Sequence, residues 1–98
     1  MEIVNRPELT PLLVGDSLKT MQIKAMAGMG MPTHHNTHEA VIIVQEGRAL
    51  LKTKDTQYIL EKGSSFLIPA YTEHKLEILK NLKAVAIMAI DSNIHFKS

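Results

Sequence analysis

Apolar and polar residues alternate with a period of two over most of this chain. In residues 20–25, polar residues hold the even positions and apolar residues hold the odd positions. Successive side chains of an extended strand point to opposite faces, so this spacing gives a strand with one wet face and one buried face. No stretch shows a convincing helical pattern, and the alternation therefore predicts an all-β protein.

Turn-forming residues divide the chain into about eight or more short strands. The segment 7–14 fits either a turn of helix or an edge strand, and residues 28–32 are expected to form a loop. The tail 91–98 is expected to be mobile or packed on the outside. Short strands separated by frequent turns are typical of a sandwich or a closed barrel. The predicted strands span residues 20–25, 40–44, 49–53, 57–60, 65–68, 74–78 and 84–90.

Length, cysteine content and charge limit the possible functions. The 98 residues suit a single domain, 1–98. The chain has no cysteine, which excludes disulfides, Cys-ligated zinc, iron–sulfur clusters and a thiolate nucleophile. Lys and Arg number 11 against 10 Asp and Glu, a formal net charge of +1. Nucleic acid is not expected as the main partner, because phosphate binding requires a basic excess.

Membrane and targeting signals are not expected either. The longest apolar run, residues 84–90, is far shorter than the roughly 20 residues of a spanning helix. Residues 1–7 lack the basic start and apolar middle of a signal peptide. The expectation is a cytoplasmic protein without membrane contacts.

Two apolar runs predict self-association. Residues 40–44 are apolar at every position and rich in Ile and Val, which favours a strand buried on both faces. Residues 84–90 form a second such run. Together they predict a homodimer.

Histidines are the candidate ligands. His34, His35 and His38 lie within five residues, and His74 begins another predicted strand. A neutral imidazole nitrogen binds zinc, iron, nickel and copper well, and three histidines can leave an open position on the metal. His95 stands apart in the tail and is expected on the surface.

Strand parity selects among these residues. His34 and His38 share the parity of the inward-facing series that continues from Ala40, and His74 begins another inward series. His34, His38 and His74 are therefore the predicted metal ligands, with His35 and Glu39 as substitutes if the turn shifts the register by one. The alternative is that these histidines are core residues whose nitrogens bond to the backbone.

Two further residues are candidates for roles beside these ligands. Glu39 is the candidate acid–base group, because a carboxylate near a metal can relay a proton. Tyr71 is a candidate for a hydrogen bond to a bound ligand, or it caps the barrel mouth.

Residues 63–74 resemble the second sequence motif of the cupin superfamily. That motif runs Gly, five residues, Pro, one residue, Gly, two residues, His, three residues, Asn. Gly63, Pro69 and His74 match its spacing, whereas Tyr71 replaces the second Gly and Ile78 replaces the Asn.

Residues 34–47 resemble the first cupin motif, His-x-His, three or four residues, Glu, six residues, Gly. Counted back from Gly47, His34 falls on the first His, Asn36 on the second His and Ala40 on the Glu. Two of the four metal ligands of the family are therefore replaced.

The resemblance implies a double-stranded β-helix, or jelly-roll barrel, that pairs as a homodimer and holds a divalent metal or a small ligand inside. His34 and His74 would line the barrel mouth. Either His38 fills the space left by Ala40, with Asn36 as a weak oxygen contact, or the metal is lost and the pocket holds an organic molecule.

The function expected from this resemblance is metal-dependent chemistry on a small polar molecule. A divalent transition metal (Zn, Fe, Ni or Mn) would support a dioxygenase or an isomerase. The alternative is a non-catalytic module that binds or senses a small ligand without metal. The fold by itself cannot separate these functions.

Overall fold

The period of two in the sequence is matched by a period of two in burial. The computed structural model describes residues 7–97, and within this range every regular element is a strand, which confirms the all-β prediction. No helix in this part of the chain has the length and apolar character needed to cross a membrane. The strands are β1 (Glu8–Val14), β2 (Leu18–Ala25), β3 (Gly30–Asn36), β4 (Ala40–Thr53), β5 (Gln57–Glu61), β6 (Ser65–Ile68), β7 (His74–Ala89) and β8 (Ile94–Phe96).

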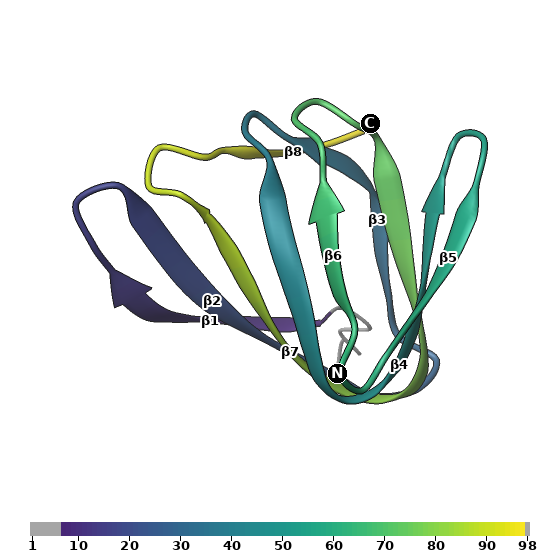
Figure 1. Cartoon of the computed structure of the whole chain (residues 1–98). Helices are drawn as coiled ribbons and strands as arrows, with labels where there is room; N and C mark the ends of the chain where they lie inside the picture. Colours follow the sequence, from purple (N-terminus) through teal and green to yellow (C-terminus); the bar gives the residue numbers. More distant parts are fainter. Residues whose placement is uncertain (1–6, 98) are drawn as a thin grey trace, which may run out of the picture.

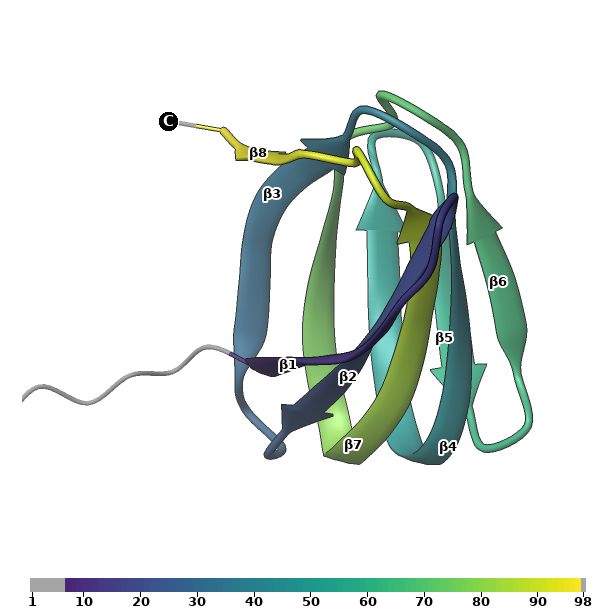
Figure 2. The ribbon, with the colours of Figure 1, turned by 90° about the vertical axis from the view of Figure 1, so that its left-hand side faces the viewer.

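Two long strands, β4 and β7, form the frame of the fold (Figure 1). They pair antiparallel from Ala40 opposite Met88 to Thr53 opposite His74. Both strands bend part-way along, so half of each lies in one sheet and half in a second sheet (Figure 1). The first sheet has the order β1-β2-β7-β4-β6, and the second has the order β8-β3-β7-β4-β5. The curled shape that results is a barrel open along one side (Figure 2).

Apolar side chains from both sheets meet inside this curl. Leu51 and Ala84 are each 0% exposed, and they lie on β4 and β7, the strands common to both sheets. Burial of aliphatic side chains is the main stabilising term for a small domain that has no disulfide. The buried apolar residues are Ile23, Ala25, Ala40, Ile42, Val44, Ala49, Leu51, Leu60, Ile68, Leu76, Ile78, Leu82, Ala84, Ala86 and Met88.

The bend in β4 depends on Gly47. Its φ is +88°, in the region that favours glycine, and the pairing of β4 with β7 shifts register on both sides of it. A Cβ at this position would overlap the backbone carbonyl of Asn81. Gly47 therefore lets the two chains approach closely where both long strands bend.

Several predicted element boundaries are wrong for this reason. The strands predicted at 40–44 and 49–53 are one strand, and those at 74–78 and 84–90 are also one. Turn-like residues mark bends in both cases, since backbone pairing continues past them. Likewise, the loop expected at 28–32 gives way to β3 from Gly30 onward.

The two ends of the described chain also form strands. Residues 8–14 form the edge strand β1 rather than a turn of helix, and β8 pairs antiparallel with β3. Of the predicted tail, Ser98 lies outside the described residues. The N-terminal residues 1–6, on which the targeting expectation rested in part, also lie outside them.

The prediction that residues 40–44 are buried on both faces is wrong for the single chain. Ala40, Ile42 and Val44 point into the core, but Ile43 is 38% exposed and Val41 is half-buried on the outer face. Across the sheet, Val41 lies opposite Leu67 and Ile87. The central part of the outer face of the first sheet is therefore apolar without being covered, next to the polar residues Thr20, Gln22 and Ser65.

The close approach at the bend predicts that two glycine substitutions lower the free energy of unfolding by different amounts. Gly63→Ala meets open space at a φ of +89° and should cost roughly 1–2 kcal/mol, from the left-handed backbone alone. Gly47→Ala adds the overlap with Asn81 and should cost about 3 kcal/mol or more. Urea unfolding of both variants measures the difference, and equal costs would contradict the close approach at the bend.

Candidate functional site

A small cavity lies between the two sheets. Its volume is about 60 Å³, enough for a few waters or one small group. Most of its wall is aliphatic, so the few polar atoms that reach it determine what it can bind. The lining residues are Leu9, Met21, Ile23, Met31, His34, Asn36, Ala40, Ile42, Leu51, Ile68, His74, Leu76, Ala86, Met88 and Ile94.

Two of the predicted ligands, His34 and His74, meet in this cavity. They are cross-strand partners, because β3 pairs antiparallel with the first half of β7. Their ring centroids lie 4.2 Å apart in an edge-to-face arrangement, and each residue is 6% exposed. On its other side, the His34 ring lies 5.3 Å from the Phe96 ring of β8, measured between centroids. The two imidazoles are thus held close together inside the protein.

Backbone carbonyls fix the protonation pattern of both rings. Nδ1–H of His34 donates to the carbonyl oxygen of Pro32 at 2.7 Å, and Nδ1–H of His74 donates to that of Thr72 at 2.8 Å. A carbonyl only accepts, so in the neutral ring Nδ1 carries the proton and Nε2 keeps a lone pair. Each ring therefore has Nε2 free to bind a metal ion or accept a hydrogen bond.

Asn36 supplies a third polar group. It is 6% exposed, lies two residues after His34 on the same face of β3, and lines the same cavity. Its Oδ1 is buried without a hydrogen-bond partner. An unpaired buried oxygen is costly unless a water or a ligand completes it, so this atom is a candidate binding position. The Asn36 backbone carbonyl accepts the N–H of Tyr71 at 2.8 Å, which ties β3 to the loop before β7.

Burial lowers the pKa of both imidazoles. For His34 the removal from water lowers the pKa below 6.5, although the bond to Pro32 opposes this and His35 adds to it. For His74 burial again has the largest effect, opposed by the Thr72 bond and reinforced by His34 and His35. Both rings are therefore neutral at pH 7, which is the state that binds a metal.

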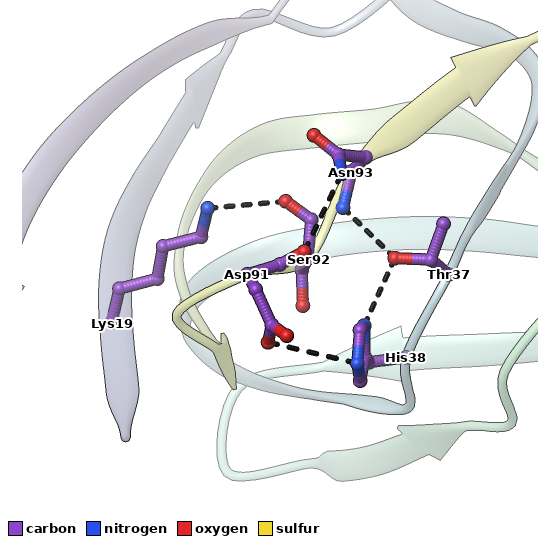
Figure 3. A network of polar contacts seen from close by, with 6 residues as sticks. All are labelled: Lys19, Thr37, His38, Asp91, Ser92 and Asn93. Carbon is purple, nitrogen blue, oxygen red and sulfur yellow. Dashed lines mark hydrogen bonds and ion pairs between the residues drawn. The ribbon is translucent and has the colours of Figure 1, made fainter. Parts of the chain in front are cut away.

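His38 does not join the pair. Its Nδ1 forms a hydrogen bond with the Thr37 hydroxyl at 2.9 Å, and its Nε2 lies 3.6 Å from an Asp91 carboxylate oxygen (Figure 3). The same hydroxyl accepts the backbone N–H of Asn93 at 3.0 Å. His38 lines an outer groove rather than the cavity. Its ring therefore joins the β3–β4 loop to the β7–β8 loop. It does not follow the predicted inward parity, because residues 37–39 form a turn and strand parity does not carry through a turn.

The remaining candidates also lie away from the cavity. Glu39 is exposed beside the outer groove. His35 points to the opposite face of β3, where its ring stacks against its cross-strand partner His95 with 5.3 Å between centroids. Tyr71 is 66% exposed, and its ring centroid lies 5.7 Å from that of His35. The structure thus separates an inner group (His34, Asn36 and His74) from an outer group of rings.

Tyr71 explains one departure from the second cupin motif. Its φ is +60°, a left-handed conformation for which glycine is favoured. The glycine of the motif thus matches a real backbone requirement, which Tyr71 meets with some strain.

Across residues 7–97, no group of three or more His, Cys, Asp or Glu side chains is arranged to hold a metal ion. The three-histidine set of His34, His38 and His74 is therefore not assembled. The inner group instead has two imidazole nitrogens and one amide oxygen. The two positions where the first cupin motif has other ligands, Asn36 and Ala40, both line the cavity.

A family model described as Cupin domain matches residues 21–90. This chain belongs to the cupin domain family. The match runs from the middle of β2 to just past the end of β7, and so includes His34, Asn36 and His74. No curated protein matches the chain.

Solved structures confirm the double-stranded β-helix fold. An uncharacterized double-stranded β-helix protein of Klebsiella pneumoniae is 14% identical, with a TM-score of 0.85 over 100% of this cupin and 90% of that chain. The DMSP lyase DddQ of Ruegeria pomeroyi is 17% identical, with a TM-score of 0.85 over 94% of this chain and 52% of its own. A salicylate 1,2-dioxygenase variant of Pseudoaminobacter salicylatoxidans is 15% identical, with a TM-score of 0.84 over 93% of this chain and 30% of its own. This cupin thus spans about half of the lyase and less than a third of the dioxygenase.

The depressed imidazole pKa values predict acid sensitivity. In the unfolded chain, both histidines take up protons near their ordinary pKa of about 6.5, whereas the folded protein resists protonation. Stability is therefore full above about pH 6.5 and falls as the pH decreases below it. Urea midpoints of metal-free protein at several pH values measure this loss. In the double variant His34→Gln/His74→Gln the acid-dependent loss should shrink, whereas in His95→Gln it should persist; an unchanged loss in the double variant would contradict this account.

Proposed function

We propose that this cupin binds one divalent transition metal ion in its cavity through His34 Nε2 and His74 Nε2, with Asn36 Oδ1 as the third donor. The observation that carries the proposal is the pairing of both Nδ1–H groups with backbone carbonyls. Metal-binding histidines usually have this arrangement, which fixes the tautomer and aims the free nitrogen at the ion. The unpaired oxygen of Asn36 in the same cavity gives the third donor.

The donor set suits zinc, iron, nickel or manganese. Imidazole nitrogen binds the first three well, and a carbonyl-type oxygen also suits manganese. Three protein ligands leave positions open, which distinguishes a catalytic site from a closed structural one. A bound metal would supply Lewis acidity to a small polar molecule, while the aliphatic wall excludes bulk water.

The reaction class we propose is a metal-dependent conversion of a small polar molecule, of dioxygenase or isomerase type. Support comes from the fold shared with a DMSP lyase and a salicylate 1,2-dioxygenase, which are enzymes. In this chain, His34 and His74 would hold the ion and Asn36 would help to orient it or its ligand. Glu39 is exposed outside the cavity, so the acid–base role expected for it has no support from its position.

The alternative is a module that binds an organic ligand without metal. The observation in its favour is the wall of the cavity, which apart from His34, Asn36 and His74 is entirely apolar. A small molecule with an apolar body and one hydrogen-bonding group would match such a wall. The two free Nε2 lone pairs would then accept hydrogen bonds rather than bind an ion.

Metal content after loading separates these alternatives. Untagged protein is equilibrated with zinc, iron, nickel or manganese, dialysed, and measured by inductively coupled plasma mass spectrometry. We expect about one metal per chain, lost in His34→Gln and in His74→Gln and weakened about tenfold or more in Asn36→Leu. His38→Gln is the matched control and should retain the metal, because His38 contacts Asp91 outside the cavity.

Two results would contradict the metal proposal. One is no retained metal under any of the four loading conditions. The other is metal that persists in the double variant His34→Gln/His74→Gln but is lost in His35→Gln or His95→Gln, which would place the ion on the outer rings.

We also propose that two copies pair through the outer face of the first sheet. Val41, Ile43, Leu67, Val85 and Ile87 lie side by side there on β6, β4 and β7. Two of them are well exposed, Leu67 at 50% and Ile43 at 38%. None of these five residues carries a charge, so they could pack against their counterparts without like-charge repulsion.

Light scattering with size-exclusion chromatography tests this pairing. We expect the mass of two chains for the wild type, and of one chain for Leu67→Lys. Ile59→Lys is the matched control, because Ile59 is similarly exposed, at 54%, but lies on β5 of the second sheet. A one-chain mass for the wild type at micromolar concentration would refute the proposal.

A further inference from the structure

The cavity contains no negative charge. Its three polar side chains are two neutral imidazoles and an amide, and among residues 7–97 no Asp or Glu lines it. Ala40, at 8% exposed, occupies a place on its wall where a longer side chain would reach inward. The charge balance of a metal ion bound here would therefore come from outside the protein.

A divalent ion in this position would be poorly compensated. An ion bound only by neutral donors keeps its full double charge. The apolar wall cannot solvate this charge, so burying the ion there costs free energy. Protein sites often meet this problem with a ligand of opposite charge in contact with the ion. Because no Asp or Glu that the structure describes lines the cavity, an anion that balances the ion would come from outside the protein.

We propose that the metal binds together with a small carboxylate, which occupies the part of the cavity that Ala40 lines. This inference rests on the proposed metal site and assigns the chemical class of its second ligand. A hard anionic oxygen suits all four candidate metals. The cavity volume of about 60 Å³ limits the part that enters to a carboxylate with few further atoms.

The surface next to the cavity favours an anion. A second hollow of about 550 Å³ shares His74 with the cavity and is lined by four lysines against two acids. Lys52 pairs with Glu77 at 2.9 Å and Lys97 with Glu73 at 3.9 Å, which leaves Lys54 and Lys75 opposite Asp55. The remaining charge is positive and lies in the same hollow as His74.

Calorimetric titration with zinc tests the co-ligand requirement. Untagged protein is titrated at about pH 7.5, above the ordinary imidazole pKa, in sodium perchlorate and in sodium acetate of equal ionic strength. Perchlorate is a poor ligand, whereas acetate supplies a carboxylate that binds zinc only weakly in water. We expect the zinc affinity to be at least about tenfold higher in acetate.

A substitution at Ala40 provides the matched comparison. Ala40→Glu places a carboxylate on the cavity wall and should bind zinc tightly in perchlorate, with no further gain from acetate. Ala40→Gln has the same size without the charge and should not bind zinc tightly in perchlorate. Thermal unfolding with and without zinc gives a second readout, in which zinc in perchlorate should stabilise Ala40→Glu but not Ala40→Gln.

The possible results separate the two proposals. Equal zinc affinity of the wild type in perchlorate and acetate would overturn the co-ligand inference and leave the metal site standing. Absence of zinc binding in both salts would overturn the metal site itself and the inference with it. Equal behaviour of Ala40→Glu and Ala40→Gln would show that charge beside Ala40 does not limit binding, which also overturns the inference.

Discussion

The antiparallel pairing of β4 with β7 is the constraint on which the rest of this structure depends. These two strands carry the central part of both sheets, and their common bend turns one sheet over the other. The bend is possible because Gly47 adopts a positive φ and lets its backbone approach Asn81. Without it, the inward faces of the two sheets would not enclose a core. The first half of β7 also pairs with β3, and this pairing sets His74 opposite His34.

The site combines rigid placement with incomplete bonding. The backbone carbonyls of Pro32 and Thr72 accept hydrogen bonds from Nδ1 of His34 and His74. These bonds fix the orientation of both rings, and so of their Nε2 atoms. Asn36 adds an oxygen with no partner in the protein. Such a set of strong but unpaired polar groups in an aliphatic cavity costs stability, and natural proteins accept this cost mainly at functional sites. Because no carboxylate of the described chain lines the cavity, an anion that balances a bound metal ion would come from outside the protein.

Much of the fold could be predicted from the sequence because burial and alternation have the same period. The inward series of His74, Leu76 and Ile78 was readable from parity, and so was the inward direction of His34. Parity failed at His38, because residues 37–39 form a turn between β3 and β4 and parity has meaning only within one strand. Parity also failed to show that β4 and β7 are continuous strands. Glycine and polar residues occur both at bends within a strand and at turns between strands, so the sequence does not distinguish the two. The role of Phe96 beside His34 was not predictable, because it depends on the pairing of the short strand β8 with β3.

The central claim is that one metal ion lies between two imidazoles from different strands. An anomalous difference map, recorded at the metal absorption edge from crystals grown with zinc and acetate, tests it most directly. The account predicts a single peak in the cavity, about 2.0–2.1 Å from both His34 Nε2 and His74 Nε2 and within bonding reach of Asn36 Oδ1. A map with no peak in the cavity, or with its peak at the outer pair His35 and His95, would contradict it.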